Sequence, residues 1–301
     1  QLFAQVTNPP LDAIREELVT ALGGTLGPER NLLAPGPDSC RQIQLSHPII
    51  TNEELLKLKE VANHPETQDF RAAVIPSLYP VADGEDGLRT ALDEIRAQAS
   101  MEIAAGAQII ILSDVGSTAE LAPIPSLLVT SAVHHHLIRE KSRTRVGLVV
   151  EAGDARECHH MCLLLGFGAA AINPYMAFAT IEDMIAQGMT GMKDPVKAVG
   201  NYIKACGKGI LKVMSKMGIS TVASYTGAQI FEAIGLGQGF VDEYFTGTVT
   251  RIEGIGLAEV AEEGDRRHAR AWPERAEELA HRGLEFGGEY QWRREGEYHL
   301  F

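Results

Sequence analysis

The sequence predicts an α/β protein built from parallel β/α repeats that form a barrel or an incomplete barrel, with a short hairpin at the carboxyl end. Three observations predict this class. Short apolar runs recur through the middle of the chain, helical patterns separate them, and the runs are apolar on both faces. Strands with two apolar faces are typical of a parallel sheet that is covered by helices.

Residues 1–70 are expected to form a linker-like segment with helices. A strand-like run ends at Asn8-Pro9-Pro10, and Asp12 is placed to cap a helix. Residues 26–46 are rich in Gly, Pro and Asn, which is typical of an irregular surface segment. Thr51 and Glu54 then have the spacing of a capping box and predict a helix that runs to about Val61.

Residues 71–245 are expected to form the β/α core. The apolar runs predict strands at 72–78, 107–113, 145–151, 169–173 and 219–224. The periodic segments between them predict helices at about 84–105, 125–140, 154–165, 178–188 and 195–217, and two short helices follow up to about Phe245.

Residues 246–301 are expected to hold a charged helix and a hairpin. The helix is predicted from about Gly256 to Arg282, where Glu and Arg are frequent. The hairpin is predicted to turn near Glu295-Gly296, inside an alternating aromatic and polar run.

The net charge argues against two classes of partner. The 301-residue chain has 27 Lys and Arg against 40 Asp and Glu, a net charge of −13, so we expect neither nucleic acid nor an anionic membrane as partner. No apolar stretch is long enough to span a bilayer. The four cysteines have neither the density nor the spacing of a disulfide scaffold, and we therefore expect a cytoplasmic location. Because the chain starts at Gln1 and ends within the alternating run, we expect it to be a segment of a longer protein.

Polar residues follow the predicted strands directly, at the end of the sheet where β/α proteins place their active sites. On a catalytic interpretation, Glu151 or Asp114 is a general base, and Asn173 or Tyr225 orients a substrate. On a structural interpretation, which is the simpler one, such residues are the helix caps and polar strand ends that every β/α unit needs. The complete set is Asp114, Glu151, Asp154, Asn173, Ser224 and Tyr225.

The loop Ser224–Ala228 follows a predicted strand and precedes a predicted helix. Backbone N–H groups at such a position can bind a phosphate. The loop matches no nucleotide-binding fingerprint, however, and a tight turn is the simpler interpretation.

Clustered cysteines and histidines raise a metal hypothesis. Cys158 and Cys162 are one helical turn apart and could bind one ion, whereas the adjacent residues His134–His136 point in different directions on a helix. Two ligands do not complete a site, so we predict no metal.

A basic stripe recurs every four residues along the helix predicted at 195–217. It lies opposite the apolar positions of that helix and is expected either to be solvated or to contact an acidic neighbouring domain. Its members are Lys204, Lys208, Lys212 and Lys216.

Several longer phrases together resemble the central domain of the glutamate synthase large chain. They include the Gln-Val-Thr-Asn-Pro-Pro stretch near the amino end, the Gly-Asp-Ala-Arg-Glu-Cys-His-His stretch, and the Ser-Tyr-Thr-Gly-Ala-Gln stretch. The resemblance runs the length of the chain, over residues 4–19, 133–177, 209–236, 245–257 and 287–301.

This resemblance implies a domain of a large amidotransferase and flavoprotein. In that family a glutaminase domain with a cysteine nucleophile releases ammonia, which passes through an internal tunnel to a barrel domain. The barrel carries FMN and a three-iron iron–sulfur cluster and converts 2-oxoglutarate to glutamate. The central domain links the two and resembles the FMN domain in topology, but it binds no flavin itself.

The family's catalytic residues fall outside this chain on the same resemblance. There is no amino-terminal cysteine here and no closely spaced cysteine triplet, so we expect neither catalytic residues nor a bound cofactor or metal. What does carry over is the stretch Gln5–Pro10, in which Thr7 and Asn8 match residues at the mouth of the ammonia tunnel. Small polar side chains beside two stiff prolines suit that role, although the same stretch also suits a turn at the start of a domain.

The resemblance therefore implies a noncatalytic central domain, inactive alone, whose partners are the glutaminase and FMN-binding domains of the same chain. The alternative is an autonomous β/α barrel enzyme. It would use Glu151, Asp114 and Asn173 at its active face, and it would bind a phosphate-bearing ligand such as FMN at 224–227.

Overall fold

A computed structural model describes residues 14–273 of the protein, and a parallel sheet stands at its centre. Four strands lie in the order β3-β5-β7-β8, and each pairs in parallel with its neighbour. Their bounds are β3 Ala72–Pro76, β5 Ile109–Ser113, β7 Gly147–Glu151 and β8 Ala171–Asn173. These four strands confirm the predicted α/β class, and no closed barrel forms within residues 14–273.

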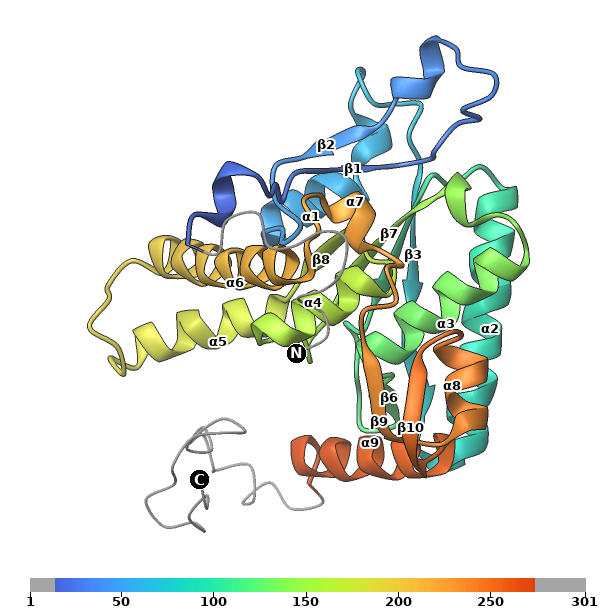
Figure 1. The fold of residues 1–301 in the computed structure, drawn as a ribbon. Helices are drawn as coiled ribbons and strands as arrows, with labels where there is room; N and C mark the ends of the chain where they lie inside the picture. The colour runs from blue at the N-terminus through green and yellow to red at the C-terminus, as the bar shows by residue number, and fades with distance from the viewer. Residues whose placement is uncertain (1–13, 274–301) are drawn as a thin grey trace.

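Helices follow the strands as the repeats predict (Figure 1). The five helices predicted between 84 and 217 are all present, and α1 ends close to the predicted Val61. The helices are α1 Asn52–Lys59, α2 Gly84–Ala104, α3 Ser126–Arg139, α4 Cys158–Gly166, α5 Tyr175–Ala186, α6 Pro195–Met217, α7 Val222–Tyr225, α8 Gln238–Tyr244 and α9 Leu257–Ala271. Short 3-10 turns lie at Glu16–Leu18, Pro37–Cys40, Val61–Asn63, Val81–Asp83 and Arg143–Arg145.

Local capping chemistry sets several of these boundaries. The Thr51 hydroxyl accepts from the Glu54 N–H, and Glu54 accepts from the Thr51 N–H, which is the predicted capping box of α1. Asp194 caps α6 by accepting from the Lys197 N–H. Gly218 ends α6 in the left-handed region at φ 73°, a conformation that favours glycine.

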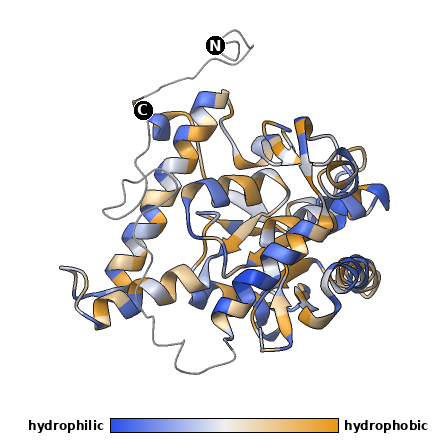
Figure 2. Ribbon diagram, turned by 90° about the horizontal axis from the view of Figure 1, so that it is seen from below, coloured by the Kyte–Doolittle hydropathy of each residue, from blue (hydrophilic) through white to orange (hydrophobic). Residues whose placement is uncertain are grey.

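Both faces of the sheet are buried because successive side chains of a strand point in opposite directions. Ile110 and Leu112 of β5 pack with α2 and α3, whereas Ile109 and Ile111 pack with α1 and Leu26. A further part of the core lies between the sheet and α4 and α6. Apolar strands lie at the centre, with helices around them, when the molecule is seen from below (Figure 2).

Three smaller strand pairs surround the sheet, and none of these pairs was predicted. β1 and β4 pair antiparallel with β2 and β6 respectively, whereas β9 and β10 pair in parallel. Their bounds are β1 Gly24–Leu26, β2 Ile43–Leu45, β4 Leu78–Pro80, β6 Leu121–Pro123, β9 Glu232–Leu236 and β10 Val249–Ile255.

The strand predicted at 219–224 is wrong. Residues 222–225 form the short helix α7, and Thr221 makes only an isolated bridge to Ala21. The place beside β8 is taken by residues 48–50 instead: Ile172 donates to the Pro48 carbonyl at 2.8 Å, and Ile50 donates to the Ile172 carbonyl at 2.9 Å. Because this edge of β8 is already paired, the apolar run at 219–224 packs against the molecule without joining the sheet.

The charged helix predicted from Gly256 is confirmed as α9 up to Ala271. The rest of that helix, to Arg282, lies outside the described residues. The hairpin predicted near Glu295-Gly296 also lies outside them, as do Thr7 and Asn8. No helix within residues 14–273 is long and apolar enough to cross a membrane.

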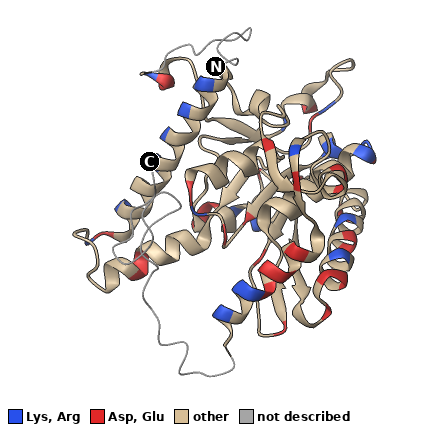
Figure 3. Ribbon diagram, turned by 60° about the horizontal axis from the view of Figure 1, so that its bottom comes forward, with Lys and Arg blue, Asp and Glu red and all other residues tan. Residues whose placement is uncertain are grey.

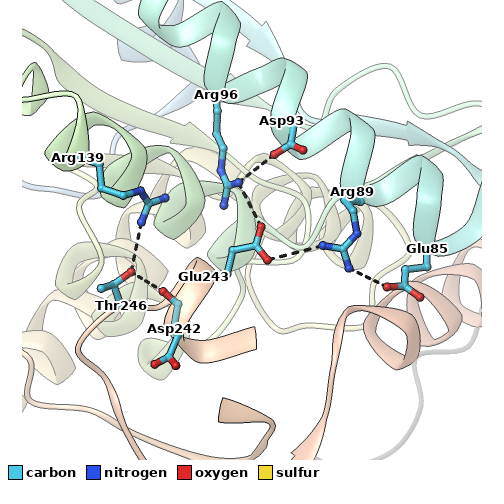
Figure 4. Close-up of polar contacts among 8 residues, drawn as sticks. All are labelled: Glu85, Arg89, Asp93, Arg96, Arg139, Asp242, Glu243 and Thr246. Atoms are coloured by element: carbon cyan, nitrogen blue, oxygen red, sulfur yellow. Dashed lines mark hydrogen bonds and ion pairs between the residues drawn. The ribbon is translucent and has the colours of Figure 1, made fainter. Parts of the chain in front are cut away.

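Ionic contacts attach α8 to α2 (Figure 4). Arg96 is 9% exposed, its guanidinium lies 3.4 Å from Glu243 and 3.0 Å from Asp93, and it stacks over the Tyr244 ring at 4.8 Å. Arg89 adds a more exposed pair with Glu243 at 3.7 Å. The buried guanidinium therefore holds α8 in place through charge and aromatic contact together.

Candidate functional site

Four of the six predicted polar residues, Asp114, Glu151, Asp154 and Asn173, follow or end strands at the carboxyl edge of the sheet. Ser113 is paired in register with Glu151, and Glu151 with Asn173, so the ends of β5, β7 and β8 lie side by side. Asp114 follows β5 directly, and its N–H donates to the Glu151 carbonyl at 3.2 Å. Sequence reasoning thus placed these residues at one edge, and the structure shows what each of them contacts.

Glu151 is fully engaged by other side chains. The Lys59 ammonium donates to both of its carboxylate oxygens, at 2.9 and 2.8 Å, and the Ser113 hydroxyl donates at 2.6 Å. The Glu151 side chain is 9% exposed. A carboxylate that is neutralised and hydrogen-bonded in this way joins α1 to the sheet and is poorly placed to act as a general base.

Asn173 has a similar structural role. Its Nδ2 donates to the Ile50 carbonyl and to Asn52 Oδ1, both at 3.0 Å. Asn173 is completely buried and connects β8 to the beginning of α1. These contacts match the structural interpretation of the strand ends.

Asp114 differs from Glu151 because no cation pairs with it within the described part of the chain. Its Oδ2 accepts from the Gly153 N–H at 2.7 Å, and its carboxylate also accepts from Tyr175. Burial raises the pKa of Asp114 to about 6, since the hydrogen bonds from Gly153 and Tyr175 only partly offset the loss of water around the charge. Burial likewise raises the pKa of Tyr175.

Asp154 is the helix cap that the structural interpretation predicts. Its Oδ2 accepts from the Ser126 N–H at 2.9 Å, at the beginning of α3. The residue is otherwise exposed. Its second oxygen therefore remains accessible beside Asp114.

A cavity of about 580 Å³ opens beside Asp114 and Asp154, and we call it the α9 cavity. The loops after β5 and β7 form one side, and α9 forms another. Its volume falls within the range of small-molecule sites in proteins. The side chains of Val115, Ile124, Tyr175, Met176, Arg267, His268 and Trp272 are among those that line it.

Close packing holds α9 against the sheet edge. A Cβ on Gly264 would lie 2.6 Å from the Tyr79 hydroxyl, so only glycine allows this approach. The Tyr79 hydroxyl donates to Asp265 at 2.8 Å, and the buried ring of His268 lies 2.7 Å from the Thr118 carbonyl. These contacts fix the wall of the cavity that α9 provides.

Sequence reasoning missed the part that α9 plays. The signal was present, because the buried residues Leu257, Ala261, Gly264 and His268 recur at helical spacing. The many charges of the same helix conceal this narrow apolar face. Lys59 was missed as well, since it lies in a segment that was expected to be linker-like.

The predicted phosphate loop does not reach this edge. Val222, Ala223 and Thr226 line a separate cavity of about 250 Å³ together with Val146 and Gly147, which lie at the start of β7. Ser224 and Tyr225 therefore follow no strand, and Tyr225 is completely buried. The strand-to-helix turn on which the anion hypothesis for 224–228 rested is absent, since α7 precedes this loop and β9 follows it.

The cysteines and histidines of the metal hypothesis contact other residues and do not converge on one point. Cys158 and Cys162 share a hydrogen bond that lowers the pKa of Cys158 and raises that of Cys162, and Cys162 and Cys206 lie in the core. His134 accepts from Arg143 at 2.9 Å, whereas His136 contacts Ser100 at 2.8 Å. No group of three or more metal-ligating side chains converges within residues 14–273.

The basic stripe lies on the outside of α6 (Figure 3). Lys204, Lys208, Lys212 and Lys216 are all exposed, and Lys212 pairs with Glu16 at 2.5 Å. α5 and α6 form a helical hairpin that projects from the sheet (Figure 1). Phe178 is the buried residue of α5.

Comparison with known proteins identifies a shared family. A family model described as the glutamate synthase central domain matches residues 1–237. The chain is 45% identical to the glutamate synthase [NADPH] large chain of Bacillus subtilis, over all of this chain and 19% of that protein. It is 40% identical to the glutamate synthase [NADH] of Schizosaccharomyces pombe, over all of this chain and 14% of that protein.

A third relative is named for ferredoxin. Ferredoxin-dependent glutamate synthase 2 of Synechocystis is 40% identical, over all of this chain and 19% of that protein. The chain therefore spans about a fifth or less of the length of these relatives.

Proposed function

The chain belongs to the glutamate synthase central domain family, and from this premise we propose that it is the noncatalytic centre of a glutamate synthase large chain. It would join a glutaminase domain to an FMN-binding domain, its partners within one polypeptide. The reaction of the whole enzyme would convert glutamine and 2-oxoglutarate to glutamate in the cytoplasm. FMN and a three-iron iron–sulfur cluster would lie on the neighbouring domain.

The observation that carries this proposal is the pattern of relatives. Proteins named for NADPH, NADH and ferredoxin are each 40–45% identical to the whole of this chain. A segment that is shared across three electron donors suits a role that is independent of the donor. Linking two domains is such a role.

The competing enzyme hypothesis is not favoured. It needs several active-face residues and a phosphate site at one edge of a barrel. Asp114 lines a cavity, but Glu151 is paired with Lys59, and residues 224–227 follow no strand. It also predicts that the isolated chain binds FMN. A fluorescence titration of the 301-residue chain should show no saturable quenching of FMN, and saturation at one equivalent would restore the hypothesis.

The finer part of the proposal concerns ammonia. Thr7 and Asn8 would contribute to the mouth of the tunnel, where small polar side chains can exchange hydrogen bonds with a neutral polar guest. The proposal rests on the resemblance of Gln5–Pro10 to the family's tunnel segment. A bulky substitution at Thr7 therefore tests the tunnel role directly.

The test uses a chimera that replaces the matching part of the Bacillus subtilis large chain with this chain. In it, Thr7→Phe should leave glutamine hydrolysis intact, lower glutamate formation from glutamine, and release ammonia to solution. The conservative Thr7→Ser should keep the two activities coupled. Equal losses of both activities in Thr7→Phe, or no loss of either, would contradict the tunnel role.

A further inference from the structure

We propose that the α9 cavity binds a small α-amino acid with an apolar side chain. The cavity has about 580 Å³ and lies between the carboxyl ends of β5 and β7 and helix α9. This proposal goes beyond the linking role proposed above, because it concerns a ligand site formed by residues 114–272.

One side of the cavity suits an ammonium group. Asp114 is only 6% exposed, and its Oδ1 has no hydrogen-bond donor in the part of the chain that the structure describes. A buried carboxylate oxygen without a donor is costly, so the site gains from a ligand that supplies one. Asp154 adds a second carboxylate on the same side, where its Oδ2 already caps α3.

The α9 side of the cavity suits a carboxylate. Arg267 lines the cavity and has only a loose pair with Glu263, at 3.8 Å between two side chains that are 63% and 57% exposed. A pair of this kind contributes little, so the guanidinium is available to bind a carboxylate. The cavity therefore places acidic groups and a basic group on different walls, which matches the two charges of an amino acid.

The remaining walls suit an apolar side chain. Val115, Ile124, Met176 and the half-exposed indole of Trp272 also line the cavity. A phosphate or a dicarboxylate would meet Asp114 and Asp154, and like charges repel. A metal ion lacks a third ligand among residues 14–273.

Tryptophan fluorescence of the 301-residue chain gives a direct readout. The chain has two tryptophans, so Trp292→Phe leaves Trp272 as the reporter inside the cavity. L-phenylalanine should change its emission saturably, with a Kd on the order of 1 mM or tighter. Phenethylamine lacks the carboxylate and 3-phenylpropanoate lacks the ammonium, so each should bind at least about fivefold more weakly.

Matched variants test which residue binds the ammonium group of the ligand and which binds its carboxylate. In this background, Asp114→Asn should weaken L-phenylalanine at least about tenfold, since a charged hydrogen bond is lost. Arg267→Gln should weaken L-phenylalanine more than it weakens phenethylamine. Arg266→Gln is the control, because the neighbouring Arg266 pairs with Glu262 and does not line the cavity.

Three results would overturn the proposal. They are no saturation by L-phenylalanine up to about 10 mM, equal binding of all three compounds, or equal binding by the parent and Arg267→Gln. Arg267 is exposed on a helix, so its substitution keeps the test valid even if Asp114→Asn fails to fold.

Discussion

Removing Lys59 should measurably destabilise the fold. Lys59→Met deletes the ammonium that donates to both carboxylate oxygens of Glu151 and leaves only the Ser113 hydroxyl as a side-chain donor. Breaking one partner of a buried pair costs about 3–5 kcal/mol, because a charge is left buried and unpaired. Lys59 is 29% exposed and Glu151 is 9% exposed, so we expect about 2–4 kcal/mol here.

A double variant separates the contribution of the ion pair from the cost of leaving Glu151 without its cation. Lys59→Met combined with Glu151→Met replaces the ion pair with apolar side chains, a change that is often neutral in a buried site. The Ser113 hydroxyl then loses its acceptor at a cost of about 1 kcal/mol. The double variant should therefore be more stable than Lys59→Met alone by at least about 1 kcal/mol.

Urea unfolding followed by circular dichroism measures these differences in the free energy of unfolding. Lys57→Met is the matched control, because Lys57 lies on the same helix and forms an exposed pair with Glu53. That control should show no measurable change. A cost for Lys59→Met no larger than the control, or a double variant no better than the single one, would refute the argument that Glu151 is a structural anchor.

Three further predictions test the site and its supports. Burial raises the pKa of Asp114 to about 6, so the folded protein favours the protonated carboxyl. The stabilisation from this bound proton is fully present below about pH 4 and is lost as the pH rises through 6. Asp114→Asn should therefore gain about 1–3 kcal/mol relative to the parent between pH 4 and 7.5 in urea unfolding, and a constant difference would contradict the shift. Gly264→Ala should lower the Tm, because the added Cβ would clash with the Tyr79 hydroxyl. Gly200→Ala, which has open space around it, should stabilise the fold by about 0.5–1 kcal/mol. A change of the same sign in both variants would refute the packing of α9. Arg96→Met should cost about 1–3 kcal/mol in the same assay and Arg89→Met about 0.5 kcal/mol or less, and equal costs would contradict the importance of the buried guanidinium.

Much of the fold was predictable because its signals are local. Within the runs at 107–113 and 145–151, residues 109–112 and 148–150 are apolar at every position, the pattern of a strand that is buried on both faces. The boundaries of α1 and α6 follow from the side chains at Thr51 and Asp194, which bond to backbone within the next turn. Such contacts can be inferred from neighbouring residues alone.

The failures have a common physical cause in non-local pairing. The run at 219–224 has the composition of a strand, but residues 48–50 already occupy the edge of β8. That contact joins segments more than a hundred residues apart, and no pattern within either segment encodes it. The strands β9 and β10 were missed for a related reason, since their burial is only partial and their apolar pattern is weak.

The sequence by itself determined that Asp114, Glu151 and Asn173 meet at the carboxyl edge, because the ends of neighbouring parallel strands meet there. It could not determine what each residue does at that edge. Lys59 neutralises Glu151 and Asn52 binds Asn173, whereas α9 encloses Asp114 beside a cavity without a cation for it among the described residues. Only the tertiary structure decided between these outcomes, because the charge and solvation of a buried group depend on neighbours that arrive from distant parts of the chain.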